Sequence, residues 1–319
     1  MRAPQAFAGP CVNDWLTLAL GVAAAGAGGE LFVRGAVGLA RRMRISPGII
    51  GATVAAFATS SPELSVAVGS ALAQRPQISL GDALGSNVVN VGLILGLALV
   101  ISGTRSPRDA IRRDFPAAIA APVLTAACLL DGVLSRAEAM LLFAGFILWF
   151  LAAIQEARRQ RSAAPAVLGE RLAGRAIAEG ALGLIMLIAA GRLIVLGAKG
   201  IALSAGIGEF VIGATVVAMG TSVPELATAI VSKLRGHDEV GLGTILGSNI
   251  FNGLFVVPLA AAIFPIAIAL REVAGALIFG LLAVALTFPA AGGWIGRGRG
   301  VLLLALFAAF LFFTLRADL

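Results

Sequence analysis

The chain alternates between long apolar runs and short polar segments from one end to the other. Apolar runs of about 20 residues recur, and each is long enough to cross the hydrocarbon core of a bilayer as a helix. We therefore predict an all-α membrane protein with ten transmembrane helices. The predicted spans are 14–40, 47–73, 79–103, 114–131, 135–155, 174–200, 208–233, 241–264, 270–290 and 299–316.

The longest polar stretch, Gln155 to Arg175, divides these spans into five and five. We predict a first repeat at 1–155, a cytoplasmic linker at 156–173 and a second repeat at 174–319. Of the 24 Lys and Arg residues, 16 fall in loops that follow odd-numbered spans. Basic loops tend to stay in the cytoplasm, so both termini are predicted to lie outside. Since five is an odd number, the second repeat enters the membrane in inverted orientation.

The two halves also share a sequence. Between 50–90 and 212–252, 21 of 41 positions are identical without a gap, at a constant offset of 162 residues. The identities include Pro-Glu and Ser-Asn pairs, which hydrophobic composition alone does not produce. The pattern indicates an internal duplication, so the fold is predicted to be two inverted five-helix repeats. Inverted repeats are typical of secondary transporters, whose site lies near the midplane at the repeat interface.

Composition supports a membrane location and removes several other classes of protein. The chain is 59% hydrophobic and 13% charged, whereas soluble domains are about 25% charged. The net charge of +7 is explained by the loops, so no nucleic-acid partner is expected. His237 is the only histidine, and Cys11 and Cys128 are isolated, so neither a His or Cys metal site nor a cofactor is predicted. No cleaved signal peptide is evident, and we expect a multi-pass plasma (inner) membrane protein that functions as a monomer.

The first polar motif lies inside an apolar run at Ala56–Leu64 and is repeated at Ala218–Leu226. Thr59 and Glu63 are four residues apart, which puts them on one face of a helix. Pro62 has no N–H group to donate, so the helix is predicted to kink there. The motif gathers carboxylate, hydroxyl and carbonyl oxygens at one depth, and these are the ligand types that bind Ca²⁺ or Na⁺.

The second motif lies at Gly85–Asn90 and is repeated at Gly247–Asn252. Ser86 and Asn90 share a helix face and add a hydroxyl and an amide oxygen. The glycines one turn apart in each copy are expected to let another helix approach closely. These glycines are Gly81 and Gly85 in the first repeat, and Gly243 and Gly247 in the second.

Energetics favours a functional interpretation of the two glutamates. A charged residue at the centre of a membrane helix costs about 2.5–3.5 kcal/mol on insertion scales. Glu63 and Glu225 would also repel each other across a pseudo-symmetric site unless a cation or proton lay between them. A single kink, hydroxyl or glycine pair has ordinary structural explanations, but the whole constellation is duplicated. Asp82, whose repeat counterpart is Thr244, is a candidate only for an access path.

The paired segments Thr-Ser-x-Pro-Glu-Leu and Gly-Ser-Asn-x-x-Asn resemble the alpha repeats of the Ca²⁺/cation antiporter superfamily, in its prokaryotic sodium/calcium exchanger branch. The resemblance implies alternating access, with spans one and six sliding across the other eight. It implies that Glu63 and Glu225 are shared ligands of Ca²⁺ and Na⁺. The further ligands it implies are Thr59, Ser60, Thr221, Ser222 and the carbonyls of Ala56 and Ala218 in flanking Na⁺ sites, with Ser86, Ser248, Asn90 and Asn252 in central and inner positions.

The sequence thus predicts an antiporter that exchanges Na⁺ for Ca²⁺, because both ions compete for the same carboxylates. The alternatives are H⁺/Ca²⁺ exchange, in which the glutamates titrate, and a cation channel. An intramembrane enzyme is not supported, because no nucleophile–base pair or HExxH motif is present. Asn252 stands where potassium-dependent relatives carry Asp, which implies a K⁺-independent protein.

Overall fold

The computed structural model describes residues 12–108, 110–163, 173–204 and 218–317. The first repeat contains α1 (Val12–Met43), α2 (Pro47–Ile50), η1 (Gly51–Ala55), α3 (Ala56–Thr59), α4 (Ser61–Leu72), α5 (Pro76–Val88), η2 (Val89–Leu95), α6 (Gly96–Ile101), β1 (Thr104–Arg105), η3 (Ala110–Asp114), α7 (Phe115–Cys128), β2 (Val133–Leu134) and α8 (Arg136–Ala163). The second contains α9 (Ala173–Ser204), α11 (Ala218–Thr221), α12 (Val223–Leu234), α13 (Asp238–Phe251), η6 (Asn252–Val256), α14 (Val257–Ile263), β3 (Ile266–Ala267), α15 (Leu270–Thr287), η7 (Ala291–Gly293), β4 (Trp294–Ile295) and α16 (Arg297–Ala317).

The chain folds into a helical bundle, as predicted, but the number of clear spans differs from ten. Within the described residues, seven helices are long and apolar enough to cross a membrane, or eight if the bent helix at 47–72 counts as one. The fourth predicted span corresponds to α7, which has 14 residues and follows the π-helical η3. By itself, α7 is too short to cross a membrane. The seventh is described only from Ala218 onward. In addition, α8 continues to Ala163, eight residues into the range predicted as a linker.

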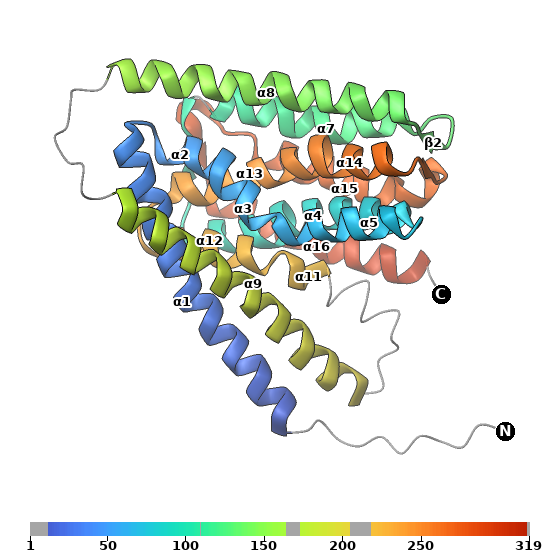
Figure 1. Ribbon diagram of the computed structural model, residues 1–319, viewed down its shortest axis with the longest axis horizontal. Coiled ribbons are helices and arrows are strands. Elements are labelled where there is room, and N and C mark those ends of the chain that lie inside the picture. The colour runs from blue at the N-terminus through green and yellow to red at the C-terminus, as the bar shows by residue number, and fades with distance from the viewer. Residues whose placement is uncertain (1–11, 109, 164–172, 205–217, 318–319) are drawn as a thin grey trace.

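Helices α1 and α9 form a pair that lies side by side and crosses the rest of the bundle obliquely (Figure 1). Their backbones touch, because a Cβ atom at Gly35 or Gly183 would collide with the backbone of Gly180 or Phe32. Glu30 joins this pair to α12 through an ion pair of 2.7 Å with Arg235. The pair comprises spans one and six, the two helices that the family resemblance implies are mobile.

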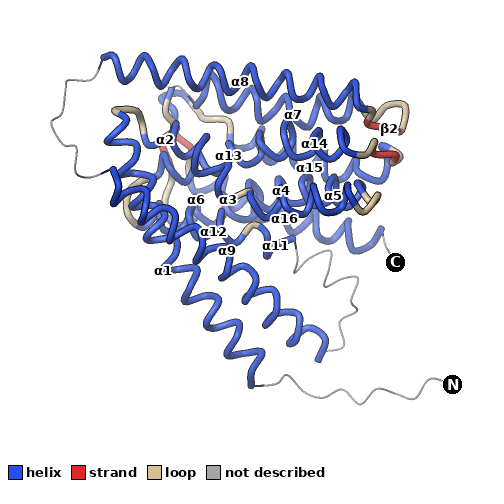
Figure 2. The backbone as a smooth tube through the Cα atoms, viewed as in Figure 1, coloured by secondary structure: helices blue, strands red, loops and turns tan. Residues whose placement is uncertain are grey.

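Two short strand pairs show how the repeats are related. Strand β1 pairs with β4, and β2 pairs with β3, at opposite ends of the bundle (Figure 2). Thr104 of β1 lies 162 residues before Ile266 of β3, which is the offset of the duplicated motifs. A two-fold operation that exchanges β1 with β3 and β2 with β4 therefore carries one pair onto the pair at the other end. This geometry confirms that the second repeat is inverted.

The motif-bearing helices occupy the centre of the bundle. The spans that begin with α5 and α13 are the most deeply buried of the candidate spans, whereas few residues of α8 and α16 are buried. Both central helices continue into π-helical turns, η2 and η6, at the end of the second motif. Such turns widen the backbone spiral and often occur at functional sites. The fold thus places both copies of the motif away from lipid.

Candidate functional site

The two copies of the first motif break their helices in the same way. Ser60 separates α3 from α4 and has φ −82° and ψ 14°, and Ser222 separates α11 from α12 with φ −85° and ψ 7°. The first helix bends by 44° at this break. Pro62 and Pro224 occupy the first turn of the helices that follow, where a missing N–H costs nothing. The predicted kink is therefore confirmed.

The break places each glutamate in the first turn of a half-helix. Glu63 is 1% exposed and Glu225 is fully buried. Negative charge is favoured at a helix N-terminus, because unpaired backbone N–H groups and the helix dipole point toward it. None of the ion pairs among the described residues involves either glutamate. Dipoles alone do not compensate two buried charges, so the arrangement calls for a cation.

Glu225 connects the two repeats through hydrogen bonds. Its Oε1 atom accepts one from the Ser60 hydroxyl of the first repeat and one from the Ser248 hydroxyl of its own repeat, each 3.1 Å long. The Thr59 hydroxyl also lies beside this carboxylate. The structure thus brings Ser60 and Ser248, both predicted ligands, to the same carboxylate oxygen.

The equivalent serine hydrogen bonds to Glu63 do not form. By repeat symmetry, Ser222 and Ser86 should donate to Glu63, but neither hydroxyl has a hydrogen-bond partner, and neither do the two Glu63 oxygens. The Thr221 hydroxyl lies beside Glu63 and Asp82. Buried polar atoms in native proteins are almost always satisfied. The unpartnered oxygens in this half of the pseudo-symmetric site are therefore well placed to coordinate a cation.

Four asparagines hold the second motifs together across the pseudo-two-fold axis. Asn87 and Asn249 donate to each other's backbone carbonyl, at 3.3 and 3.1 Å. Asn90 donates to the Asn249 side-chain oxygen, and Asn252 donates to the Asn87 side-chain oxygen, both at 3.2 Å. With their NH₂ groups engaged in this way, Asn90 and Asn252 keep their Oδ1 atoms unpartnered.

Asn87 and Asn249 are residues that the prediction of site residues left out. Both were visible in the sequence as a polar side chain repeated at the 162-residue offset within an apolar helix. They fix the rotamers of the predicted ligands Asn90 and Asn252, which are fully buried. Asn87 and Asn249 thus support the candidate ligands through hydrogen bonds.

The remaining predicted residues have more varied positions. The Ala56 carbonyl accepts the Ser60 N–H at 3.0 Å and the Thr59 hydroxyl at 3.3 Å, so both of its lone pairs are engaged, and a cation could bind this oxygen only in place of one of these hydrogen bonds. Ala218 is the first described residue of α11. Asp82 lies one turn before Ser86 on α5, partly exposed, and faces Thr221, Glu63 and Glu225.

The prediction that the paired glycines let another helix approach closely is confirmed in the second repeat. A Cβ atom at Gly243 or Gly247 would collide with the backbone of Gly48 or Ala52. Around Gly81 and Gly85 no described atom lies within 4 Å of such a Cβ. Their repeat-related neighbours, near residues 210–214, fall outside the described residues, so this half stays a prediction.

Together these oxygens define a cation site at the interface of the repeats. Seven buried oxygens of the predicted ligands lack hydrogen-bond partners: both from Glu63, one from Glu225, and one each from Ser86, Ser222, Asn90 and Asn252. Among the described residues, no three His, Cys, Asp or Glu side chains lie close enough to hold a metal. A cation bound here would thus combine carboxylate oxygens with neutral hydroxyl and amide oxygens, as Ca²⁺ and Na⁺ accept.

An inverted-repeat helical bundle with a buried oxygen site at its centre defines a membrane transporter of cations, not an enzyme. The sequence model of the family described as sodium/calcium exchanger protein matches residues 13–155 and 177–316. The chain belongs to this family, and its two matched segments correspond to the two repeats.

Individual relatives agree with this assignment. The chain is 37% identical over 236 residues to inner membrane protein YrbG of Escherichia coli, which covers 71% of the chain and 73% of the relative. It is 28% identical to the sodium/calcium exchanger MaX1 of Methanosarcina acetivorans, covering 93% and 97%. A solved structure of the sodium-calcium exchanger NCX_Mj soaked with Na⁺ and Sr²⁺ superimposes with a TM-score of 0.82 at 28% identity, covering 93% and 97%.

Proposed function

We propose that this protein exchanges Na⁺ for Ca²⁺ by alternating access, with both ions competing for Glu63 and Glu225. The observation that carries the proposal is the set of seven unpartnered oxygens, arranged over both repeats and shielded from lipid. Two buried carboxylates are neutralised by one divalent cation, and the empty, charged site resists reorientation across the membrane. The NCX_Mj structures soaked with Na⁺ and Ca²⁺ or Sr²⁺ support the same ion set.

The choice of Na⁺ over H⁺ as counter-ion rests on the neutral oxygens. Protonation of Glu63 and Glu225 would need no further ligands, whereas Na⁺ needs several oxygens around it. Ser222, Ser86 and Asn90 offer such oxygens, buried and unpartnered. H⁺/Ca²⁺ exchange is the second candidate, because two carboxylates suffice for it. A channel would require a continuous pathway, and a neutralised site between inverted repeats suits alternating access better.

The orientation in the membrane follows from the charges. We propose that the arginine-rich loops and the segment 156–173 are cytoplasmic and both termini lie outside. The protein is proposed to reside in the inner membrane, as the name of YrbG states for that relative, and to work as a monomer. Since Asn252 is neutral, we expect no K⁺ requirement.

Uptake of ⁴⁵Ca²⁺ into proteoliposomes tests the proposal. With the membrane voltage clamped, an outward Na⁺ gradient is expected to drive Ca²⁺ accumulation, and a pH gradient of equal size is expected to drive none. The internal control is the same vesicle with choline in place of Na⁺. Accumulation driven by the pH gradient alone would instead establish H⁺/Ca²⁺ exchange, and uptake that does not saturate with Ca²⁺ would indicate a channel.

Asp82 provides a second test, aimed at the approach to the site. Because its carboxylate faces both glutamates, Asp82 adds to the negative potential that concentrates cations there. Asp82→Asn is therefore expected to weaken the apparent Ca²⁺ affinity by about ten-fold while the maximal rate changes less. The matched control is Asp131→Asn, which removes an exposed carboxylate at a turn. Equal Ca²⁺ affinity in both variants would remove Asp82 from the access path.

A further inference from the structure

A cavity of about 440 Å³ lies between the α2–α3 segment and α8, outside the cation site. Its walls are made by the end of α1, the segment that leads to Thr59, one face of α8, and Phe251 of α13. Its lining residues include Met43, Ile45, Thr53, Ala58, Trp149 and Ala157.

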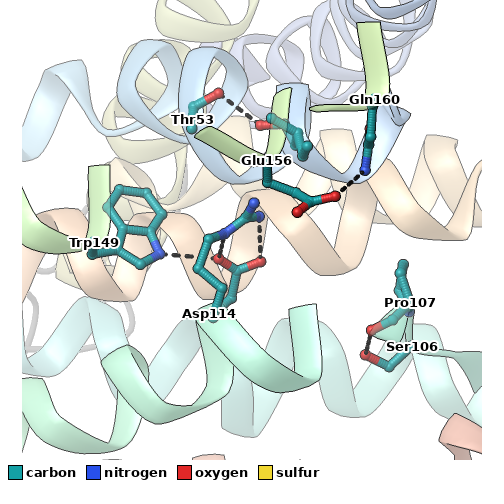
Figure 3. Close-up of polar contacts among 9 residues, drawn as sticks. Thr53, Ser106, Pro107, Asp114, Trp149, Glu156 and Gln160 are labelled. Atoms are coloured by element: carbon teal, nitrogen blue, oxygen red, sulfur yellow. Dashed lines mark hydrogen bonds and ion pairs between the residues drawn. The ribbon is translucent and has the colours of Figure 1, made fainter. Parts of the chain in front are cut away.

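The cavity presents an apolar surface even where its lining residues are polar. The Thr53 hydroxyl donates to the Ile49 carbonyl at 2.6 Å, and the Trp149 indole N–H donates to Asp114 at 3.0 Å. Figure 3 shows both side chains with their polar atoms engaged in this way. Asp114 is in turn held by Arg113 at 2.7 and 2.9 Å. No lining side chain is therefore left to coordinate an ion, and the cavity suits an alkyl chain.

Its length and volume match one chain of a membrane lipid. Within the helical segment that begins at Pro47, the lining runs from Ile49 to Ala58. At 1.5 Å per residue this is roughly 14 Å, about the depth of one leaflet of a hydrocarbon core that is about 30 Å thick. The volume of about 440 Å³ is many times the roughly 30 Å³ that one water molecule takes up in the liquid, so the cavity has room for several linked methylene groups.

An apolar lining does not by itself retain a lipid, because the surrounding bilayer is equally apolar. Selective retention needs polar contacts at the mouth, and the mouth is basic. Arg44 lies between the lining residues Met43 and Ile45, and Arg161 lies one turn beyond Ala157 on the same face of α8. Glu156, on the same part of α8, accepts a hydrogen bond from Gln160 at 3.2 Å, and Glu239 packs against Gly48.

A hydrogen bond also fixes the two sides of the cavity mouth to each other. The Gln160 side-chain oxygen accepts the Ser46 backbone N–H at 2.7 Å, which ties the turn between α1 and α2 to α8. Arg44 adopts a left-handed backbone conformation with φ 57° in this turn. The turn that carries Arg44 is therefore held against the part of α8 that carries Arg161.

We propose that this cavity is a binding site for one anionic phospholipid, with an acyl chain between α2–α3 and α8 and the phosphate on Arg44 and Arg161. A zwitterionic lipid carries the same chain but gains less from the two arginines, so the site selects for negative charge. The inner end of the chain would touch Ala56 and Ala58, directly before the Thr59–Ser60 break. The site is independent of which ion the protein exchanges.

Native mass spectrometry of the full chain tests the proposal, after exchange into equal amounts of phosphatidylglycerol and phosphatidylcholine. The wild type is expected to retain one phosphatidylglycerol molecule in preference to phosphatidylcholine. Arg44→Gln and Arg161→Gln should each lower that preference by about five-fold, because a basic residue near an anionic surface contributes on the order of 1 kcal/mol. The matched control is Arg271→Gln, an exposed arginine at the start of α15.

A cavity-filling variant tests the chain position separately. Ala153→Phe places a ring inside the cavity and should abolish retention, whereas Ala152→Phe on the exposed face of the same helix should not. Equal retention of the two lipids by the wild type would overturn the proposal, as would unchanged retention in Ala153→Phe. If Ala153→Phe does not fold, the Arg44→Gln and Arg161→Gln variants decide the question by themselves.

Discussion

Replacing Glu63 by Gln is expected to abolish Ca²⁺ transport while raising the thermal stability of the cation-free protein. Both Glu63 oxygens are buried and unpartnered, so in the empty site this charge is a cost to folding that the amide removes. With cation bound, the same charge is a ligand. Losing one member of a buried charge pair costs about 3–5 kcal/mol, which corresponds to at least about a 100-fold loss of Ca²⁺ binding.

The measurement combines ⁴⁵Ca²⁺ flux with thermal unfolding in detergent. Wild type should gain stability with added Ca²⁺, because a ligand that binds only the folded state stabilises it, and Glu63→Gln should gain none. The control Glu272→Gln changes an exposed glutamate at the start of α15 and should behave like wild type. Normal uptake by Glu63→Gln would refute the assignment of the site.

Glu225→Gln separates ligand loss from misfolding. Its Oε1 atom accepts hydrogen bonds from Ser60 and Ser248, and a glutamine oxygen can accept both. The fold should therefore persist while transport is lost. A folded Glu225→Gln protein with full Ca²⁺ uptake would show that the two carboxylates do not act as a pair.

Gly247→Ala is expected to have the second-largest effect, through packing instead of charge. The added Cβ would meet the carbonyl group of Ala52 in η1, and backbone atoms cannot rotate out of the way as a side chain can. Overpacking of this kind costs about 1–3 kcal/mol, and it displaces the helix carrying Ser248 from Glu225. We expect a lower unfolding temperature and a transport rate reduced by at least about ten-fold.

Gly275→Ala is the matched control, because that glycine is exposed on α15 and a Cβ there meets no described atom within 4 Å. Alanine is preferred over glycine in a helix, so this variant should be neutral or slightly more stable. The same unfolding and flux assays compare the two variants. If Gly247→Ala behaved like Gly275→Ala, the backbone contact with η1 would not limit the position of α13.

Local chemistry was readable from the chain alone. Helical membrane character, the duplication, and the bend at Ser60 follow from apolar run length, a fixed offset and the missing N–H of Pro62. The ligand types at Thr59, Glu63 and their copies also follow, because a polar group in an apolar helix needs a reason to be there. These properties depend on residues within one or two helical turns of each other.

The hydrogen bonds between helices were decided by the tertiary structure. Only the folded protein shows that Ser60 donates to Glu225 of the other repeat, whereas Ser222 does not donate to Glu63. Only the folded protein shows, too, that Asn87 and Asn249 orient the ligand amides. A repeated motif is symmetric in sequence, so it cannot indicate which copy of a hydrogen bond forms. That asymmetry arises from the position of each helix, which is set by packing between segments some 160 residues apart.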